Sequence, residues 1–281
     1  MKIDYMSDIH LEFPEHRNIF PTVSGGDILI LGGDITTAAM FRSHRTDSDA
    51  RSHSKFMKKF KKDVVDKYSQ VFYIMGNHEH YRSIFRKTLP ELKEGFANHG
   101  MDKIEFFDND SKVVDDVLFV GSTLWSDFEN GNDLSMYRCG RGMNDYRLIG
   151  LLDVEDFNYF NRHKTKMITP EFILDEHKKS KGYIERTVKM YPDKKVVVFT
   201  HYGPTYKSLN FDHIGNGLDG AYCSDLSNLI LDNPNITHWV SGHCHTIKEY
   251  EVGQCMVMTN CRGYSMEPTY RKFTGPKSFE V

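Results

Sequence analysis

The sequence predicts an α/β fold in which buried strands alternate with helices. Short apolar runs rich in Val, Ile and aromatic residues recur along the 281 residues, and helical spacing occurs between some of them. Polar clusters of Asp, Asn and His follow five of these runs. Because ligands collect at the carboxyl ends of the strands in such sheets, the clusters indicate one functional site.

Five strands are expected at the apolar runs, which are Ile3 to Met6, Asp27 to Leu31, Val71 to Met75, Val196 to Thr200 and Thr237 to Val240. Apolar runs of this length that end in Gly, Asp or Asn are typical of strands buried on both faces. The clusters that follow them in order are Asp8 with His10, Asp34, Asn77 with His78 and Glu79, His201, and His243 with His245.

Two helices and two hairpins are expected between these strands. The segment Lys55 to Tyr68 has apolar residues at four-residue spacing, and Arg82 to Asn98 is a second helical segment. Two alternating runs around Asp115 and Asp116 predict one hairpin, and Tyr250 to Met258 predicts another.

A single domain covering residues 1 to 281 is expected, with an irregular cap-like insertion around residues 126 to 170. The stretch Ser126 to Asn144 is rich in Gly, Asn and Arg without periodicity, so it is expected to form a loop or a small cap. The sequence shows no internal repeat and no low-complexity linker that would divide the chain.

The composition favours a cytoplasmic protein that does not contact membranes. No apolar run is long enough to cross a bilayer, and the first expected strand leaves no room for a signal peptide before it. The five scattered cysteines are expected to be reduced thiols. The net charge of -3 does not indicate a nucleic-acid binder, although residues 42 to 67 carry nine Lys or Arg against four Asp.

Each polar cluster taken alone has an ordinary structural explanation. Asp8 with His10 could cap a helix, Asp34 could belong to a plain turn, and Asn77 with His78 could form a solvated turn. His243 and His245 could lie on a strand with only one of them facing a site. The occurrence of all five clusters in order, each after a strand, favours a metal site instead.

Together the clusters resemble the motifs of the calcineurin-like metallophosphoesterase superfamily. The pattern D-x-H, G-D, G-N-H-E, H and G-H-x-H occurs in this order between residues 8 and 245. Four further segments resemble its soluble bacterial and phage branch, namely Ser7 to Phe13, Leu124 to Phe128, Ala221 to Leu226 and Arg262 to Tyr264. The resemblance implies a four-layer α/β/β/α sandwich, which the pattern of strands and helices permits.

The resemblance also implies a centre of two divalent metal ions. Such a pair would generate a bridging hydroxide and offset the charge on the phosphoryl oxygens. Carried over to this chain, one ion is bound by Asp8, His10 and His245, the other by Asn77, His201 and His243, and both by the bridging Asp34. Carboxylate and amide oxygens mixed with imidazoles favour Mn, Fe, Zn or Ni, and we expect Mn.

Catalysis and substrate binding are expected to involve residues next to these ligands. The resemblance makes His78 the general acid, or a cation that stabilises the transition state, and makes Asp34 part of the catalytic centre. Asn77 and His78 are expected to face the substrate. Arg262 is expected to bind phosphate through its guanidinium group, with a surface ion pair as the alternative.

The expected function is metal-dependent hydrolysis of a small phosphodiester or nucleotide. Protein Ser/Thr phosphatases of this superfamily carry G-D-x-x-D-R-G, whereas residues Gly33 to Ala39 lack the second Asp and the Arg. The lipid A precursor hydrolases carry an Arg where this chain has His78. The alternatives are a nuclease acting on DNA or RNA and a non-catalytic metal-binding scaffold. The sequence leaves the oligomeric state open.

Overall fold

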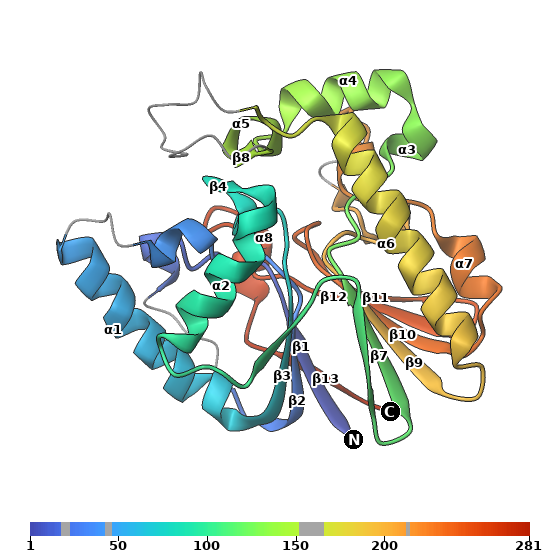
Figure 1. The fold of residues 1–281 in the computed structure, drawn as a ribbon. Helices are drawn as coiled ribbons and strands as arrows, with labels where there is room; N and C mark the ends of the chain where they lie inside the picture. The colour runs from blue at the N-terminus through green and yellow to red at the C-terminus, as the bar shows by residue number, and fades with distance from the viewer. Residues whose placement is uncertain (18–22, 43–46, 152–165, 212–213) are drawn as a thin grey trace.

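Two β-sheets packed face to face form the centre of the computed structural model, which describes residues 1–17, 23–42, 47–151, 166–211 and 214–281 (Figure 1). The first sheet has the order β13-β1-β2-β3-β5 and is parallel except for β13. Its strands are β1 (Lys2–Met6), β2 (Gly26–Leu31), β3 (Tyr68–Ile74), β5 (Ile104–Phe107) and β13 (Lys277–Glu280).

The second sheet has the order β11-β12-β10-β9-β7-β6. Its strands are β6 (Asp110–Val114), β7 (Val117–Ser122), β9 (Lys195–Thr200), β10 (Ile236–Ser241), β11 (Ile247–Val252) and β12 (Cys255–Asn260). The four inner strands are parallel, and antiparallel pairs β6–β7 and β11–β12 form the two edges. These pairs confirm both expected hairpins. A separate short pair joins β4 (Ser83–Ile84) to β8 (Ile149–Gly150).

Helices cover the outer face of each sheet and complete the four layers of the predicted sandwich (Figure 1). The first sheet is covered by α1 (Asp47–Asp63) and α2 (Thr88–Ala97), and the second by α6 (Pro170–Met190) and α7 (Ser227–Leu231). Between the sheets lies an apolar core that includes Tyr5, Phe72, Phe119 and Phe199. The central strands of both sheets are buried on both faces, so their apolar runs are continuous. The two packed sheets with helices outside them confirm the α/β/β/α class.

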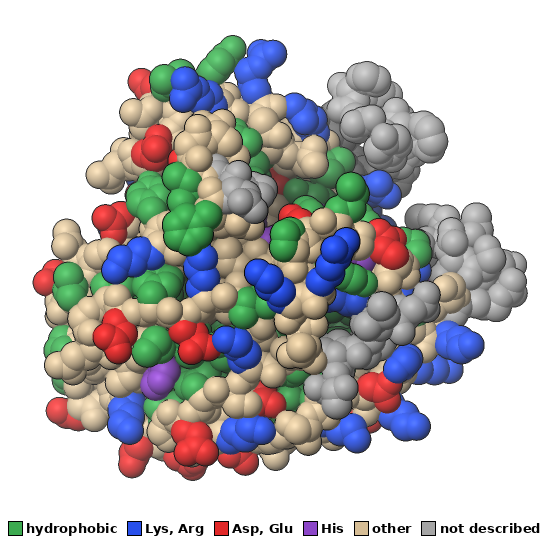
Figure 2. Space-filling view, turned by 180° about the vertical axis from the view of Figure 1, so that it is seen from behind, with side chains coloured by type: hydrophobic (Ala, Val, Ile, Leu, Met, Phe, Trp, Pro, Cys, Tyr) green, Lys and Arg blue, Asp and Glu red, His purple; other side chains and the backbone are tan. Residues whose placement is uncertain are grey.

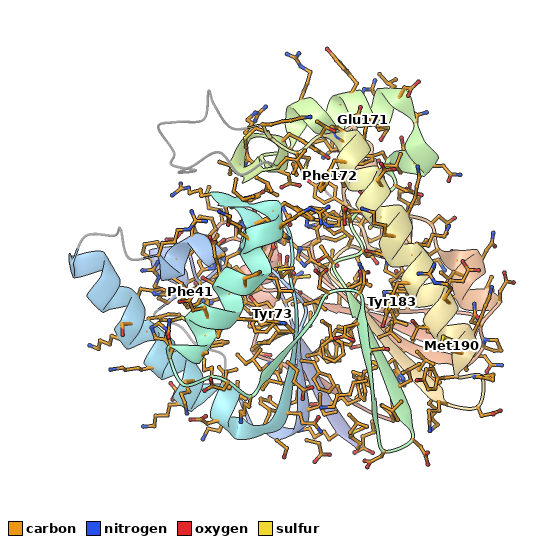
Figure 3. All side chains as sticks on the ribbon, in the orientation of Figure 1. Phe41, Tyr73, Glu171, Phe172, Tyr183 and Met190 are labelled. Carbon is orange, nitrogen blue, oxygen red and sulfur yellow. The ribbon has the colours of Figure 1, made fainter. Side chains whose placement is uncertain are left out.

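The aromatic residues of the outer layers show how the helices are held (Figure 3). Phe41 and Tyr73 lie beside α2, where their rings are 5.1 and 5.5 Å from that of Phe96. Along α6, Phe172 and Tyr183 pack against the core of the second sheet. The short 3₁₀ helices are η1 (Pro14–His16), η2 (Ala38–Phe41), η3 (Val65–Lys67), η4 (His78–His80), η5 (Phe85–Lys87), η7 (Tyr206–Ser208) and η9 (Asp219–Ala221).

The insertion is helical, which corrects the expectation that the loop or small cap at Ser126 to Asn144 is irregular. It contains α3 (Phe128–Gly131), α4 (Asp133–Gly142) and α5 (Asp145–Leu148). The Asn132 side chain caps α4 by accepting a hydrogen bond from the Ser135 amide. Because α4 buries only a few residues, its sequence has little apolar periodicity. Residues 152–165 of the expected insertion lie outside the described residues.

The helix bounds also differ from those expected. Helix α1 begins at Asp47 and ends at Asp63, and Tyr68 already belongs to β3. Helix α2 begins at Thr88 because residues 83–84 pair with β8 instead. The sequence did not predict α6, because half of its six buried positions are polar (Ile173, His177, Ser180, Ile184, Thr187, Val188). The last helix is α8 (Pro268–Lys272).

All five cysteines are buried, and none forms a disulfide. Within the described part of the chain, no helix has both the length and the apolar character needed to span a bilayer.

Candidate metal centre

The five polar clusters meet at one edge of the two sheets. Each occupies the loop after a parallel strand, because β1, β2 and β3 run parallel to one another and β9 runs parallel to β10. A parallel bridge between Ser7 and Cys261, which follow β1 and β12, brings the carboxyl ends of the two sheets together. All are at most 8% exposed, so none is a surface group: Asp8, His10, Asp34, Asn77, His78, His201, His243 and His245. The structure therefore brings together every residue predicted to bind metal, although their role as ligands stays a prediction.

Strained backbone marks the same loops. Five of these residues have positive φ angles between 46° and 63°, namely Asp8, His10, Asp34, His243 and His245. Such angles are costly for residues other than Gly and persist only where the surrounding contacts enforce them. Close packing explains why residue 76 is a glycine, because an added Cβ would lie 2.2 Å from Asp34 Oδ1 and 2.6 Å from His201 Nε2. The loops are thus arranged to bring side chains together.

Three overlapping groups of donor atoms could each hold a metal ion, with the atoms of each group within 4.8 Å of one another. They are Asp8, His10 and His245; Asp34, His201 and His243; and His10, Asp34 and His78. Asn77 Oδ1 lies 3.2 Å from His201 Nε2, beside the second group. Asp34 belongs to two groups, a position that suits the bridging ligand expected from the sequence.

Hydrogen bonds on the outer side of the centre orient three of the imidazoles. The Nδ1 atom of His10 lies 3.0 Å from Glu12 Oε1, and that of His245 lies 2.6 Å from Glu267 Oε2. The Nδ1 atom of His201 lies 2.8 Å from the Gly32 carbonyl. Because these acceptors place the hydrogen on Nδ1, each Nε2 is left to face the centre as a metal ligand would.

Two nitrogen positions show that this donor set fits cations. The Nε2 atoms of His10 and His245 are only 3.2 Å apart. Since carboxylates hold both Nδ1 hydrogens, two lone pairs would face each other there unless a proton or a metal ion lay between them. The buried Nε2 of His243 has no hydrogen-bond partner within the described residues. Carboxylate oxygens mixed with imidazole nitrogens suit divalent transition metals.

In the metal-free arrangement, the buried carboxylates draw protons onto two imidazoles. Burial lowers the pKa of His201 and of His245, but the charge of Asp34 on the first and the hydrogen bond of Asp8 on the second raise both to about 10. Burial and the charge of His201 instead lower the pKa of His243 to about 3. Metal ions would replace these protons as the counter-charge to the carboxylates.

His78 lies beside the two groups with its ring nitrogens already engaged. Its Nδ1 is 2.8 Å from Glu12 Oε1, its Nε2 is 3.1 Å from the Tyr264 hydroxyl, and Asp34 Oδ2 is farther away at 3.9 Å. Burial lowers the pKa of His78, but the charge of Asp34 and the hydrogen bond that His78 donates to Glu12 raise it to about 9. The ring is therefore an imidazolium at neutral pH, the form that a general acid requires.

Asn77 is oriented by a carboxylate that the sequence did not reveal. Its Nδ2 donates to Asp145 Oδ1 at 2.9 Å, and the Tyr81 hydroxyl donates to the same oxygen at 2.7 Å. The amide oxygen of Asn77 consequently faces His201 and the centre. Asp145 comes from α5, far from the motifs in sequence, so no local spacing could have identified it.

Glu79 has a structural role. Its carboxylate accepts hydrogen bonds from the amides of Asp34, Ile35 and Gly76 and from the Tyr73 hydroxyl, at 2.6 to 2.9 Å. It thereby ties the loop after β2 to the loop after β3.

The guanidinium of Arg262 does not reach the substrate position expected for it. Arg262 is 2% exposed, and its side chain donates to the His16 carbonyl and to the Tyr270 hydroxyl, each at 3.0 Å. The guanidinium group also lies over the Tyr270 ring, and this cation–π contact adds to the structural role of Arg262. The sequence motif is near the centre, but a different member of it, Tyr264, lines the cleft.

A cleft of about 240 Å³ opens over the centre. One wall is the end of α4 and the following residues, and another is formed by Leu209, Asn210, Leu218 and Tyr222. Its described lining residues include no Lys or Arg: Asp34, Asn77, His78, Tyr81, Gly142, Met143, Asn144, Leu209, Asn210, Leu218, Tyr222, His243, Cys244, His245, Tyr264 and Glu267.

Comparisons with known proteins agree with this geometry. A family model described as calcineurin-like phosphoesterase matches residues 1–246. An uncharacterised protein of Acanthamoeba polyphaga mimivirus is 29% identical over 94% of this chain and 91% of its own length. The crystal structure of a phosphopantetheinyl hydrolase from Mycobacterium tuberculosis has a TM-score of 0.65 at 12% identity, covering 99% of this chain and 95% of that one.

Proposed function

Because the chain belongs to the calcineurin-like phosphoesterase family, we propose that it hydrolyses a small phosphodiester or nucleotide at a centre of two metal ions. Family membership makes the chain a metal-dependent phosphoesterase, and the number of metal ions and the substrate are part of the proposal. The cytoplasmic location, the preference for Mn and the single-domain organisation stay predictions.

The observation that carries the proposal is the pair of donor groups that Asp34 joins. Asp8, His10 and His245 form one group, and Asp34 with His201 and His243 forms the other. Asp34 also lies within the same range of His10. A single carboxylate shared between neighbouring groups is the arrangement that a two-metal site needs, because it offsets the charge of both cations.

Two divalent cations, when bound, supply a hydroxide nucleophile near neutral pH and offset charge on the phosphoryl oxygens. The chain would hold one through Asp8, His10 and His245 and the other through Asn77, His201 and His243, with Asp34 shared. His78, fixed at Nδ1 by Glu12, donates the proton that the leaving oxygen needs.

The lining of the cleft favours a phosphodiester over a phosphate monoester. Apart from metal ions, His78 is the main cationic group available to the substrate, since the described lining contains neither Lys nor Arg. A monoester brings two negative charges and a third terminal oxygen, which call for further donors. Met143, Leu218 and the Tyr222 ring provide an apolar wall for the organic part of the substrate.

The nuclease and scaffold alternatives have less support. Two of the lysines in the basic segment already pair with carboxylates of the same segment, Lys59 with Asp63 and Lys61 with Asp66, so they are engaged within it. On the face drawn in Figure 2, blue and red side chains are interspersed rather than gathered into one basic stripe. A scaffold that had lost catalysis would have no need of a complete donor set with an added acid.

The test is to strip the protein of metal and reload it with Mn, Fe, Zn or Ni. Elemental analysis should find two equivalents per chain, and bis(4-nitrophenyl) phosphate should be hydrolysed only by the loaded protein. A panel of nucleotides, cyclic nucleotides and single-stranded nucleic acid would then identify the substrate class. One equivalent of metal at saturation would contradict the two-metal centre, and metal binding without turnover of any ester would favour the scaffold.

A further inference from the structure

Tyr264 lies beside the proposed acid in the cleft. Its hydroxyl is 3.1 Å from His78 Nε2, and both residues line the cleft. Tyr264 is 37% exposed, whereas His78 is only 6% exposed. A substrate that enters the cleft therefore meets a more exposed side chain at Tyr264 than at His78.

Several contacts fix the position of this tyrosine. Its amide donates to Glu267 Oε2 at 2.9 Å, and its ring packs on the rings of His10 and His245 with centroids 4.8 and 4.6 Å apart. The preceding Gly263 has a φ of 76°, and its amide donates to the Asp8 carbonyl at 3.1 Å. The hydroxyl is thus held beside His78 by the same loops that build the centre.

The imidazole of His78 is held equally firmly from the other side. Glu12 Oε1 engages Nδ1 at 2.8 Å, and the Tyr81 ring packs against the His78 ring with centroids 4.1 Å apart. Only Nε2 is left to exchange a proton with the cleft, and the hydrogen-bond partner of Nε2 is the hydroxyl of Tyr264. Glu12, His78 and Tyr264 therefore form one hydrogen-bonded chain that leads from a buried carboxylate to the cleft.

We propose that the Tyr264 hydroxyl is a catalytic group that passes the proton of His78 to the leaving oxygen. This inference rests on the proposed phosphodiester hydrolysis. As the bond between phosphorus and the leaving oxygen breaks, that oxygen keeps the electron pair and takes the hydroxyl proton of Tyr264. The tyrosine oxygen takes the proton of His78 Nε2 in the same step, so it ends as a hydroxyl. His78 ends neutral, with its Nδ1 hydrogen still held by Glu12, and regains a proton from water.

The test compares two substitutions on two diesters. In Tyr264→Phe the ring packing is kept and only the hydroxyl is lost, and in His78→Asn the acid is lost. On an alkyl or ribose diester, whose leaving oxygen needs a proton, each variant should lose roughly 10² to 10⁴ in kcat. On bis(4-nitrophenyl) phosphate each should lose less than about tenfold, because an aryl oxide departs without full protonation. Both variants should retain the metal content of the wild type.

The double variant and a matched control complete the design. Because the two groups act in one chain, Tyr264→Phe combined with His78→Asn should be no slower than the worse single variant. Tyr222→Phe removes a hydroxyl from another wall of the same cleft, and any loss it causes should be equal for the two esters. That control separates a leaving-group effect from a general change of the cleft.

Each contrary outcome has a distinct meaning. Tyr264→Phe could lower kcat equally on both diesters, or on neither, while His78→Asn still lowers kcat more on the alkyl or ribose diester. In that case the proton relay through Tyr264 is wrong and the acid role of His78 stands. If His78→Asn itself shows equal losses, both the relay and the acid role are overturned. Absence of diester hydrolysis by the metal-loaded wild type would overturn the proposed function and the relay together.

Discussion

Carboxylates outside the predicted ligand set do much of the positioning in the centre. Glu12 engages both His10 and His78, and Glu267 engages His245. Burial raises the pKa of Glu12, but the charges of His10 and His78 lower it to about 2, so it remains a carboxylate throughout the neutral range. In the protein Ser/Thr phosphatases, a second Asp in the G-D-x-x-D-R-G cluster supports the catalytic His. This chain has Thr37 at that position, and Glu12 supports His78 from another loop.

The sequence could predict which residues gather at the centre but not these supports, for a physical reason. The predicted ligand residues follow strands at fixed short spacings, because the carboxyl ends of the strands converge on one site. Supporting carboxylates need only reach a ring nitrogen, so any nearby loop can supply them. Glu267 lies 22 residues from His245, and Asp145 lies 68 residues from Asn77. For the same reason the sequence could not tell which member of the segment Arg262 to Tyr264 faces the cleft.

At the residue scale, the first prediction concerns Asp34. Asp34→Asn should abolish hydrolysis and lower the metal content of both sites, because Asp34 groups with His201 and His243 and also lies within the same range of His10. Elemental analysis of the purified variant, beside turnover of bis(4-nitrophenyl) phosphate, provides the measurement. Two full equivalents of metal in the variant would show that Asp34 does not bridge. The matched control is Asp108→Asn, which alters a carboxylate outside the centre and should leave metal content unchanged.

The second prediction concerns pH. The pKa values of His201 and His245, raised from 6.5 to about 10, mean that both imidazoles carry protons at pH 7.5 without metal. Metal binding must displace these protons, so about two should be released per chain, and metal affinity should rise with pH. Calorimetric titration in buffers with different ionisation enthalpies measures the release. A binding enthalpy that does not depend on the buffer would contradict it.

The sign of the pH effect on stability follows from the same groups. Raised imidazole pKa values stabilise the metal-free fold fully below pH 6.5, and this contribution is lost as pH rises toward 10. The lowered pKa of Asp8 has the opposite sense, since its contribution is present above pH 3.8 and is lost in acid. Melting curves recorded with a chelator at pH 6, 8 and 10 should therefore show a falling Tm, and saturating metal should reduce the fall.

At the scale of the elements, the loops after β2 and β3 are joined by Glu79. Its two oxygens accept four hydrogen bonds, and a Gln side chain offers only one oxygen for them. Glu79→Gln should therefore lower the free energy of unfolding by about 1–3 kcal/mol. Chemical denaturation measures the change. Glu105→Gln, which breaks a half-exposed ion pair with Lys112, should lower the free energy of unfolding by at most about 1 kcal/mol. An equal decrease for the two variants would contradict the role of Glu79 in joining the two loops.

The elements also show where sequence patterns are informative. The five strands were predicted because a strand buried on both faces must be apolar along its whole length. Helix α6 escaped prediction because His177, Ser180 and Thr187 occupy buried positions, which breaks the apolar stripe. The Thr169 cap and Pro170 at the first turn mark its start, and together with its length they were the available signals.

At the scale of the whole molecule, distant parts of the chain share one cleft. The centre forms where the carboxyl ends of strands from both sheets meet, and the insertion with α4 and α5 adds a wall that carries Met143 and Asn144. The family model matches residues 1–246, whereas Tyr264 and Glu267 lie beyond residue 246. Residues after the matched region thus have two roles: Glu267 holds His245 in place, and Tyr264 and Glu267 line the cleft.

The charge of this composite cleft leads to the last prediction, a preference for diesters. The described lining contributes Asp34 and Glu267 but no Lys or Arg, so the third terminal oxygen of a monoester finds no cationic side chain beyond His78. A hydrogen bond to a charged group contributes about 1.5–3 kcal/mol, and its absence corresponds to roughly tenfold or more in kcat/KM. The metal-loaded protein should therefore favour bis(4-nitrophenyl) phosphate over 4-nitrophenyl phosphate by at least about tenfold. Asn144→Arg should shift this ratio toward the monoester, whereas Asn144→Gln should leave it unchanged. A wild type that prefers the monoester would show that the metal ions alone supply enough positive charge for a dianion, and the composition of the walls would then not set the preference.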